Sequence, residues 1–464
     1  MKWRNFLRNK GRTLCLRGLT LDNLNFLWEL SEDERHGVEN LDLANTSVKD
    51  ISAIKGLLNL ERLELYAADI DDISVLRGLQ NLRVLRLGQT PVGDISAVEA
   101  LVELENLELF GTRVSDISPL AGLRKLRVLR LGNSEVGDLD PLRHLSGLVG
   151  LYLENTELED LRPISALGAL QWLRIDGTEL ESINALGELC ELRALWLNDT
   201  RLRDISALES LTNLELLWLG DTEVTDLSPL RKLLKLLTLN LENTSVVDLT
   251  PLENLIEMKA LNLQGTLLSD ISPLSRLGRL TTLNLEQTAV RDVSSVAEMT
   301  ELKVLDLQNT LVSDISSLSH LGSLESLYLE NTLVGDISSL AGLDGLELLD
   351  LVDTLVADIL ALAGLKSLRE LYLQNTQVTD IFPLEGMPTL ETLDLFGTRV
   401  RDLSVLPTLS NLKFLDIGRS PVSDLSPLVG LQGLQELHLR DCSVDRAVLE
   451  KLREANPQLS IISD

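Results

Sequence analysis

The sequence is poor in aromatic residues and in cysteine, and each shortage removes a class of protein. Phe, Trp and Tyr make up only 3% of the 464 residues although 44% of the chain is hydrophobic, so leucine, isoleucine and valine must form the core. The three cysteines, Cys15, Cys190 and Cys442, lie too far apart for a disulfide framework or a paired metal site. We therefore expect free thiols, no metal and no cofactor.

The sequence also contains no long apolar run. No stretch reaches the roughly 18 residues that a transmembrane helix requires, which predicts no membrane insertion. The basic segment at residues 1–12 is not followed by the apolar region of a secretory signal peptide. We therefore expect a cytoplasmic protein, and export without a signal peptide also fits this sequence.

What the chain has in abundance is one repeated unit. The pair Leu41–Leu43 recurs every 22 residues as far as Leu437–Leu439, which gives nineteen copies without an insertion, and a degenerate twentieth stands at Leu459–Ile461. One unit, Leu104–Lys125, reads LENLELFGTRVSDISPLAGLRK. Exact repeats of this length indicate a solenoid in which each unit packs only on its neighbours.

The pattern within this unit predicts its secondary structure. Leu107 and Leu109 alternate with Glu108, as in a short strand with two inward side chains and one outward. After a turn at Gly111–Thr112, apolar residues return along the opposite side; they are Val114, Ile117, Leu120 and Leu123. Twenty-two residues are too few for a strand and a long helix, so the return should contain a short 3₁₀ or α turn.

These repeats resemble the leucine-rich repeat family, in particular its 22-residue class. The segment DISPLAGL at Asp116–Leu123 is similar to the repeats of bacterial internalins and of phosphatase-regulating leucine-rich repeat subunits. The resemblance covers residues 41–439. It implies an α/β fold, a right-handed curved solenoid with one parallel sheet on the concave face and short turns on the convex face. It also implies that the concave face binds protein. The sequence departs from the family in having mostly Thr where the turn usually carries Asn.

Two rows of identical residues are better explained by folding than by function. The turn position carries Thr in fifteen of nineteen repeats, where a buried hydroxyl can satisfy backbone groups; the exceptions are Ala68, Ser134, Ser420 and Cys442. A second row runs from Asp50 to Asp424 and is Asp in seventeen of nineteen repeats. Asp at the start of a helical turn accepts hydrogen bonds from free backbone N–H groups. A calcium ladder is the alternative, but calcium sites supply several oxygen ligands per turn.

The charge of the chain points away from nucleic acid. The net charge is −29, and −12 remains when the seventeen Asp of this row are set aside. Phosphate binding requires a basic surface, so a nucleic-acid partner is not expected. A basic protein partner fits, and charge at this level also keeps a long array soluble.

Both ends of the array have the features of caps. We predict an N-terminal cap over residues 1–40, nineteen repeats over 41–439 and a C-terminal cap with a helix over 440–464. Leu24, Leu27 and Leu30 have helical spacing, which places Trp28 at the surface of the first cap. In the second cap the residues expected to cover the last coil are Val448, Leu449 and Leu452. Neither end is long enough for an independent domain.

The repeats carry little that indicates catalysis. They contain no phosphate-binding glycine loop, nucleophile elbow or paired metal ligands. His438 is expected beside Asp416 and near Asp394, which is the one arrangement that could orient an imidazole. Since no nucleophile lies nearby, a polar contact at the edge of the face is preferred to a general base.

The variable residues of the strand face are the best candidates for function, because the fold leaves them free. Seven of the nine Trp and Tyr residues fall on this face when Tyr66, just past its strand, is included. One predicted partner-binding group occupies consecutive coils and consists of Tyr152, Trp172, Arg174, Arg193, Trp196 and Trp218, with Arg130 beside it. Trp, Tyr and Arg are the usual anchors of protein interfaces. The alternative is that these bulky side chains merely cover the strands.

A second, weaker group alternates aromatic and acidic residues: Tyr328, Asp350, Tyr372 and Asp394, followed by Asp416. It would suit a basic or mixed segment of a partner. Between the groups, Asn240, Asn262 and Asn284 are interpreted as a structural amide ladder. The leading hypothesis is a monomeric, non-catalytic protein-interaction scaffold or regulatory subunit. The alternatives are a secreted or injected bacterial effector or adhesin of the same fold and, more distantly, an enzyme with a site on the repeats.

Overall fold

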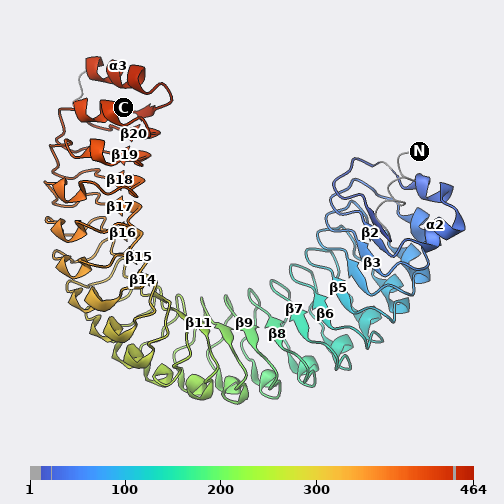
Figure 1. The fold of residues 1–464 in the computed structure, drawn as a ribbon. Coiled ribbons are helices and arrows are strands. Elements are labelled where there is room, and N and C mark those ends of the chain that lie inside the picture. Colours follow the sequence, from blue (N-terminus) through green and yellow to red (C-terminus); the bar gives the residue numbers. More distant parts are fainter. Residues whose placement is uncertain (1–11, 22, 443–445, 464) are drawn as a thin grey trace. The chain divides into compact units, whose positions relative to one another are not determined.

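The computed structural model describes residues 12–21, 23–442 and 446–463, which divide into two compact units after Leu236. Residues 1–11, which carry most of the basic N-terminal segment, lie outside this description. In each unit, successive coils contribute a short strand to one face and a short helical turn to the opposite face (Figure 1). This is the leucine-rich-repeat solenoid that the 22-residue period predicts.

The N-terminal unit covers residues 1–236. Its strands are β1 (Thr13–Cys15), β2 (Asn40–Asp42), β3 (Arg62–Glu64), β4 (Val84–Arg86), β5 (Asn106–Glu108), β6 (Val128–Arg130), β7 (Gly150–Tyr152), β8 (Trp172–Arg174), β9 (Ala194–Trp196) and β10 (Leu216–Trp218). Its helices are η1 (Asn25–Glu29), α2 (Glu32–His36), η2 (Ser52–Gly56), η3 (Ser74–Gly78), η4 (Ser96–Ala100), η5 (Ser118–Leu120), η6 (Asp140–Leu142), η7 (Arg162–Ile164), η8 (Asn184–Leu186), η9 (Ser206–Ser210) and η10 (Ser228–Lys232), where η marks a 3₁₀ helix.

The C-terminal unit covers residues 237–464. Its strands are β11 (Thr238–Asn240), β12 (Ala260–Asn262), β13 (Thr282–Asn284), β14 (Val304–Asp306), β15 (Ser326–Tyr328), β16 (Leu348–Asp350), β17 (Glu370–Tyr372), β18 (Thr392–Asp394), β19 (Phe414–Asp416), β20 (Glu436–His438) and β21 (Ser460–Ile462). Its helices are η11 (Thr250–Leu252), η12 (Ser272–Arg276), η13 (Ser294–Glu298), η14 (Ser316–His320), η15 (Ser338–Leu340), η16 (Leu360–Leu362), η17 (Phe382–Leu384), η18 (Leu406–Thr408), η19 (Ser426–Gly430) and α3 (Arg446–Ala455).

The core of each unit is made by equivalent leucines of successive coils. Neighbouring repeat strands pair in parallel at an offset of 22 residues, so that Leu107 of β5 lies beside Leu129 of β6. Leu107 and Leu109 are fully buried, and so are the four apolar residues predicted for the return of that coil. The exact period therefore sets both the strand pairing and the continuous leucine core. Within the described part of the chain, no helix combines the length and the apolar composition needed to cross a bilayer.

The predicted role of the turn Thr is confirmed. The Thr112 hydroxyl is buried and donates a 2.6 Å hydrogen bond to the Leu109 carbonyl, and the same bond recurs in the other Thr turns. Ser134 and Ser420 make it as well. The residue before each turn Thr adopts positive φ, as Asn155 does at 53° before Thr156. That left-handed position is filled mainly by Asn, Asp and Gly, which tolerate it best.

This bond predicts a matched pair of substitutions at Ser134, which is buried and bonds to the Leu131 carbonyl. Ser134→Ala removes only the hydroxyl and should lower the free energy of unfolding by about 1 kcal/mol. Ser134→Thr keeps the hydroxyl, adds the methyl group of the other turns and should not destabilise. Urea denaturation of both variants measures the difference. Equal stability of the Ala and Thr variants would show that the hydroxyl is not what the turn requires.

The Asp row is also structural, with one difference in detail. Each Asp accepts a hydrogen bond from the backbone N–H two residues later, as Asp50 does from Ser52 at 2.7 Å and Asp424 from Ser426 at 2.8 Å. The Asp stands one residue before the cap position of the 3₁₀ turn and forms an Asx turn rather than a formal helix cap. The bonds from the Ser52 backbone and hydroxyl hold the pKa of Asp50 below its usual value. Among the described residues, no three His, Cys, Asp or Glu side chains come together as metal ligands would.

Helices lie at both ends of the array. In the first cap, Leu24, Leu27 and Leu30 are buried and Trp28 is exposed, but the helical stretch is divided into η1 and α2. Ser31 divides it because its side chain caps α2 and pairs with Glu34 in a capping box. In the second cap α3 packs on η19 and β21 pairs with β20. Leu452 is buried, whereas Val448 and Leu449 are half-buried. Residues 443–445 of this cap and Asp464 are outside the described part.

Candidate functional site

The predicted aromatic residues of the N-terminal unit lie on adjacent strands of one face. Tyr152 on β7 is opposite Arg174 on β8, which is opposite Trp196 on β9, and Trp196 is opposite Trp218 on β10. Trp172 lies two residues before Arg174, on the same strand face, and is 38% exposed. Arg193 precedes β9. We call these six residues the N-terminal face patch: Tyr152, Trp172, Arg174, Arg193, Trp196 and Trp218. The register brings all of them together in four successive coils.

Gly150 shapes the first part of this patch, and it is not among the residues predicted from the sequence. A β-carbon on Gly150 would lie 3.2 Å from Cε2 of Tyr152 and 3.8 Å from Cε3 of Trp172. The two rings therefore converge over the space that the missing side chain leaves. Gly150 is the first residue of β7. A glycine within a strand often marks such a close approach, and that was the available signal in the sequence.

Carboxylates form ion pairs with both arginines of the patch. Arg174 Nε lies 3.0 Å from an Asp176 carboxylate oxygen, and Arg193 lies 3.2 Å from Glu215. The Arg130 guanidinium stacks 4.2 Å from the centroid of the Tyr152 ring. These contacts leave the guanidinium groups partly exposed while limiting the conformations that they sample. The patch is thus an ordered mixture of aromatic faces and cations.

The residues of the second predicted group also lie side by side on adjacent strands, but their side chains are less exposed to a partner. Tyr328, Asp350, Tyr372 and Asp394 are consecutive partners across β15 to β18, and we call them the C-terminal face patch. Both tyrosines are half-buried, and the Tyr372 hydroxyl donates a 2.7 Å hydrogen bond to Glu370. Asp394 is only 4% exposed, and it accepts hydrogen bonds from the Phe396 N–H and the Gln374 side chain. Asp394 therefore offers little contact area of its own.

Three carboxyl groups on this face have raised pKa values, so they ionise less readily than in water. Burial raises the pKa of Asp306 to about 6, and repulsion from Glu286, Asp350 and Glu330 adds to the effect against one backbone hydrogen bond. Burial likewise raises the pKa of Asp394 to about 6, with repulsion from Asp416. The pKa of Asp350 is raised, again mainly by burial. A row of carboxylates in this state favours the approach of positive charge.

These raised pKa values predict an unusual dependence of stability on pH. A carboxyl group that binds its proton more tightly in the folded protein destabilises the fold when it ionises. Stability should therefore rise as the pH falls from 7.5 to 5. The double variant Asp306→Asn/Asp394→Asn should gain about 1 kcal/mol at pH 7.5 and clearly less at pH 5. Thermal denaturation at the two pH values measures this, and a variant with the parent's pH dependence would contradict it.

The structure modifies two other predictions, those for the Asn ladder and for His438. The Asn ladder does not run simply from amide to amide: Asn262 donates to Glu242, and its own oxygen accepts the Gln264 N–H. His438 lies 3.2 Å from Asp416, as expected, and its other ring nitrogen lies 2.7 Å from Glu436. Burial lowers the pKa of His438, but the bonds to Glu436 and Asp416 outweigh it and the pKa is raised. With both ring nitrogens engaged, this imidazole is a structural contact.

Comparison with known proteins agrees with the geometry. A family model described as two copies of leucine-rich repeats matches residues 102–144, 190–232, 300–342 and 366–408. In sequence and in fold, the repeated units of this chain match leucine-rich repeats. No curated protein matches its sequence.

Among solved structures, this leucine-rich repeat chain is similar to the internalin InlF of Listeria monocytogenes. The identity is 28%, with 69% of this chain and 88% of the internalin covered and a TM-score of 0.58. A leucine-rich repeat protein of Leptospira interrogans covers 95% of this chain and 100% of its own at 21% identity and a TM-score of 0.62. The ectodomain of the Arabidopsis thaliana receptor kinase GASSHO1/SCHENGEN3, solved with Casparian strip integrity factor 2, covers 97% and 75% at 18% identity and a TM-score of 0.53. The last two likenesses show the fold alone.

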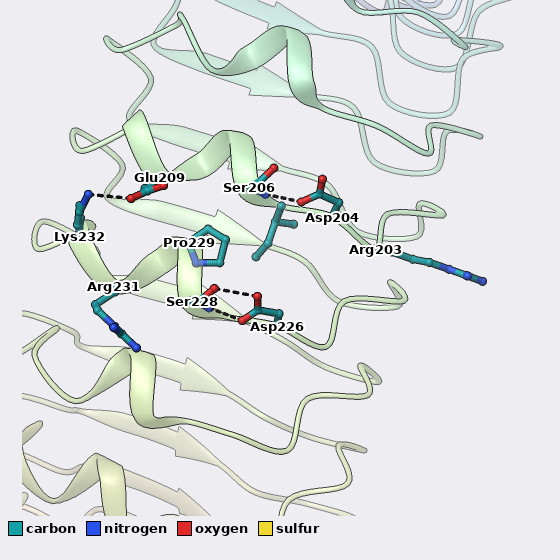
Figure 2. Close-up of a pocket in the computed structure, with 10 residues that line it drawn as sticks. Arg203, Asp204, Ser206, Glu209, Asp226, Ser228, Pro229, Arg231 and Lys232 are labelled. Carbon is teal, nitrogen blue, oxygen red and sulfur yellow. Dashed lines mark hydrogen bonds and ion pairs between the residues drawn. The ribbon is translucent and has the colours of Figure 1, made fainter.

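Three cavities lined by described residues of this leucine-rich repeat protein lie between successive coils on the helical side. One of about 370 Å³ is lined by residues of η9, η10 and the segments before them, among them Arg203, Glu209 and Lys232 (Figure 2). Asp204 and Asp226 of the structural Asp row sit at its edge and bond to the serines two residues later. Cavities at equivalent positions occur in the C-terminal unit. Their recurrence makes them a product of coil stacking.

Proposed function

We propose that this leucine-rich repeat protein is a non-catalytic interaction scaffold or regulatory subunit that binds a protein partner on its strand face. The fold is typical of protein-interaction scaffolds. The observation that carries the proposal is the N-terminal face patch, in which Trp172, Trp196 and Trp218 occupy three successive strands. The leucine core is complete without these side chains, so folding alone gives no reason for them to gather there.

The geometry suits an interface in two further respects. Aromatic rings and arginines at the centre of an interface supply most of its binding energy. Arg174 and Arg193 are already restrained by Asp176 and Glu215, so little additional order has to be imposed when a partner binds. We place the C-terminal face patch as a secondary contact, where Tyr328 and Asp350 would meet a basic or mixed segment. The array would act as a monomer, without nucleic acid, and in the cytoplasm.

A second candidate function is that of an exported bacterial effector or adhesin, which the 28% identity to an internalin favours. It uses the same face and differs in delivery, so fractionation of cells that produce the full chain separates the two. An enzyme with a site on the repeats is the remaining alternative. His438, its best candidate residue, has both ring nitrogens bonded to carboxylates, which leaves no free base.

The test is affinity capture with the intact chain and with a Trp196→Ala/Trp218→Ala variant as parallel baits, followed by mass spectrometry. We expect at least one protein that the parent retains and the variant loses, at equal bait loading and with unchanged bait folding. If every recovered protein binds both baits equally, the N-terminal face patch is not the binding surface.

A further inference from the structure

One position of the repeat, which is polar in most coils, is apolar in two adjacent coils. The residue two places after each Asp of the Asp row is polar in fifteen of seventeen cases and is usually Ser. Its hydroxyl can bond to the Asp carboxylate, as Ser228 does to Asp226 at 2.8 Å. Leu360 and Phe382 replace it in successive coils, begin the neighbouring helices η16 and η17, and are 66% and 63% exposed. Folding gains nothing from this exchange.

Further exposed leucines lie in the coil of Leu360 and in the two coils before it. Leu311, Leu333 and Leu355 directly follow three successive turn Thr residues and are 37%, 49% and 52% exposed. The same position in the N-terminal unit is charged in six successive coils: Arg113, Glu135, Glu157, Glu179, Arg201 and Glu223. An apolar side chain is therefore not required there by the repeat. We call Leu311, Leu333, Leu355, Leu360 and Phe382 the apolar edge patch.

A cavity lies beside Leu360 of the apolar edge patch. It has a volume of about 530 Å³ and runs from Gly335 and Ala341 to Leu360 and Ala361. A β-carbon on Gly335 would lie 3.6 Å from the Leu355 side chain, so Leu355 lies next to a residue that lines the cavity. The patch thus includes a hollow lined by Leu360 and close to Leu355, which single scattered surface leucines do not have.

The equivalent cavity of the N-terminal unit has different chemistry. Six repeats earlier, the positions of Gly335, Ala341, Leu360 and Ala361 are occupied by Arg203, Glu209, Ser228 and Pro229 (Figure 2). The Asp residues at the edge are common to both cavities. The charged groups of Arg203 and Glu209 and the hydroxyl group of Ser228 are thus absent from the second cavity at these positions.

The backbone of these coils also differs. After η15, η16 and η17 the chain turns through an extended residue and a glycine with positive φ: Gly342 at 87°, Gly364 at 99° and Gly386 at 70°. The other three-residue helices before η15, such as η5, continue into a helical residue instead. A β-carbon on any of the three glycines would meet no atom within 4 Å, so this side is open. The change in side chains and the change in backbone coincide.

The charge around the patch indicates what can cover it. Between Lys303 and Arg399 there are fifteen Asp and Glu residues, whereas Lys and Arg occur only as Lys366 and Arg369. Asp336 and Asp358 line the cavity itself. A second copy of this chain would bring the same carboxylates against one another, and an anionic lipid surface would be repelled. The surroundings therefore favour a cationic partner.

We propose that the apolar edge patch is a second docking surface, which binds a protein segment whose aliphatic side chains are flanked by lysine or arginine. The aliphatic side chains cover Leu355, Leu360 and Phe382 and enter the cavity. The basic side chains meet Asp336 and Asp358. This surface is separate from the strand face, so its partner and that of the N-terminal face patch can be different proteins.

The test uses the full chain and a synthetic peptide of leucine and lysine in amphipathic helical order, about 18 residues or five turns long, titrated by fluorescence anisotropy at physiological salt. The variant Leu360→Ser/Phe382→Ser restores the usual repeat residue and should melt at or above the parent's temperature. We expect it to bind the peptide at least tenfold more weakly than the parent. A peptide with glutamate in place of lysine should bind the parent at least tenfold more weakly too.

Two controls locate the site. Leu234→Ser removes a similarly exposed leucine from the N-terminal unit and should leave the affinity unchanged. Tyr328→Ala/Tyr372→Ala alters the acidic strand face and should also leave it unchanged. The proposal is overturned if the Leu360/Phe382 variant keeps parental affinity, if the tyrosine variant loses binding, or if both peptides bind equally. It is also overturned if light scattering shows that the parent self-associates through these two residues, since a second copy is then the occupant.

Discussion

Replacing Trp196 and Trp218 together with alanine should abolish most partner binding while leaving the fold intact. Each truncation of a central aromatic anchor costs about 2 kcal/mol or more, which is roughly a thirtyfold loss of affinity. The two side chains are neighbours across β9 and β10, so their contributions are coupled and the pair should lose at least about a hundredfold. Surface plasmon resonance with the captured partner measures the change.

The structure explains why this variant should still fold. Leu195 and Leu217, which precede the two Trp residues, are fully buried and carry the packing of these coils. Trp196 and Trp218 lie on the opposite side of their strands and are only half-buried. The melting temperature should therefore fall by no more than a few degrees, which corresponds to about 1 kcal/mol in a domain of this size.

A matched control lies on the helical side of the same unit. Arg231 and Lys232 line the cavity of Figure 2, and Lys232 forms an exposed ion pair with Glu209 at 2.7 Å. Such pairs contribute little to stability, so Arg231→Ala/Lys232→Ala should preserve both folding and binding. Loss of binding in this control, or retention in the Trp variant, would contradict the assignment of the strand face as the interface.

The repeat pattern made most of the architecture predictable. A fixed period of 22 determines which residues lie side by side, and Leu107 beside Leu129 follows from it directly. The roles of Thr112 and Asp50 were predictable because a buried hydroxyl or a carboxylate at a turn has few partners within reach. In a repeat, one correctly interpreted coil predicts the others.

The features that could not be predicted are departures from that period. Gly150 matters because it has no side chain. The space that this leaves for the Tyr152 ring can be recognised only when the positions of the neighbouring rings are known. Asp394 is buried and accepts hydrogen bonds from two neighbours, Gln374 and Phe396, that no pattern of carboxylates reveals. The exposure of apolar side chains at the start of η16 and η17 depends on which way each 3₁₀ turn faces, and the period alone does not give that direction. The candidate surfaces of this protein therefore lie where the repeats differ.

Deleting residues 446–464 should destabilise the array more than any substitution on the strand face or in the turns. The deletion removes α3, which packs on η19, and β21, which pairs with β20. It exposes Leu437 and Leu439 at the edge of the array, and the backbone groups of β20 lose their partners. An uncapped solenoid with an open strand edge is prone to fray and aggregate.

A single substitution tests the role of the cap without deleting the segment. Leu452 is 1% exposed, so Leu452→Ala should lower stability by about 2 to 5 kcal/mol, as for other buried leucines. In a repeat array that loss stays local, because each coil contacts only its neighbours. Hydrogen exchange should therefore show early opening of the coils nearest the C-terminus, with the N-terminal unit protected as in the parent. A truncated protein that remains monomeric and melts in one unchanged transition would show that this segment does not cap the array.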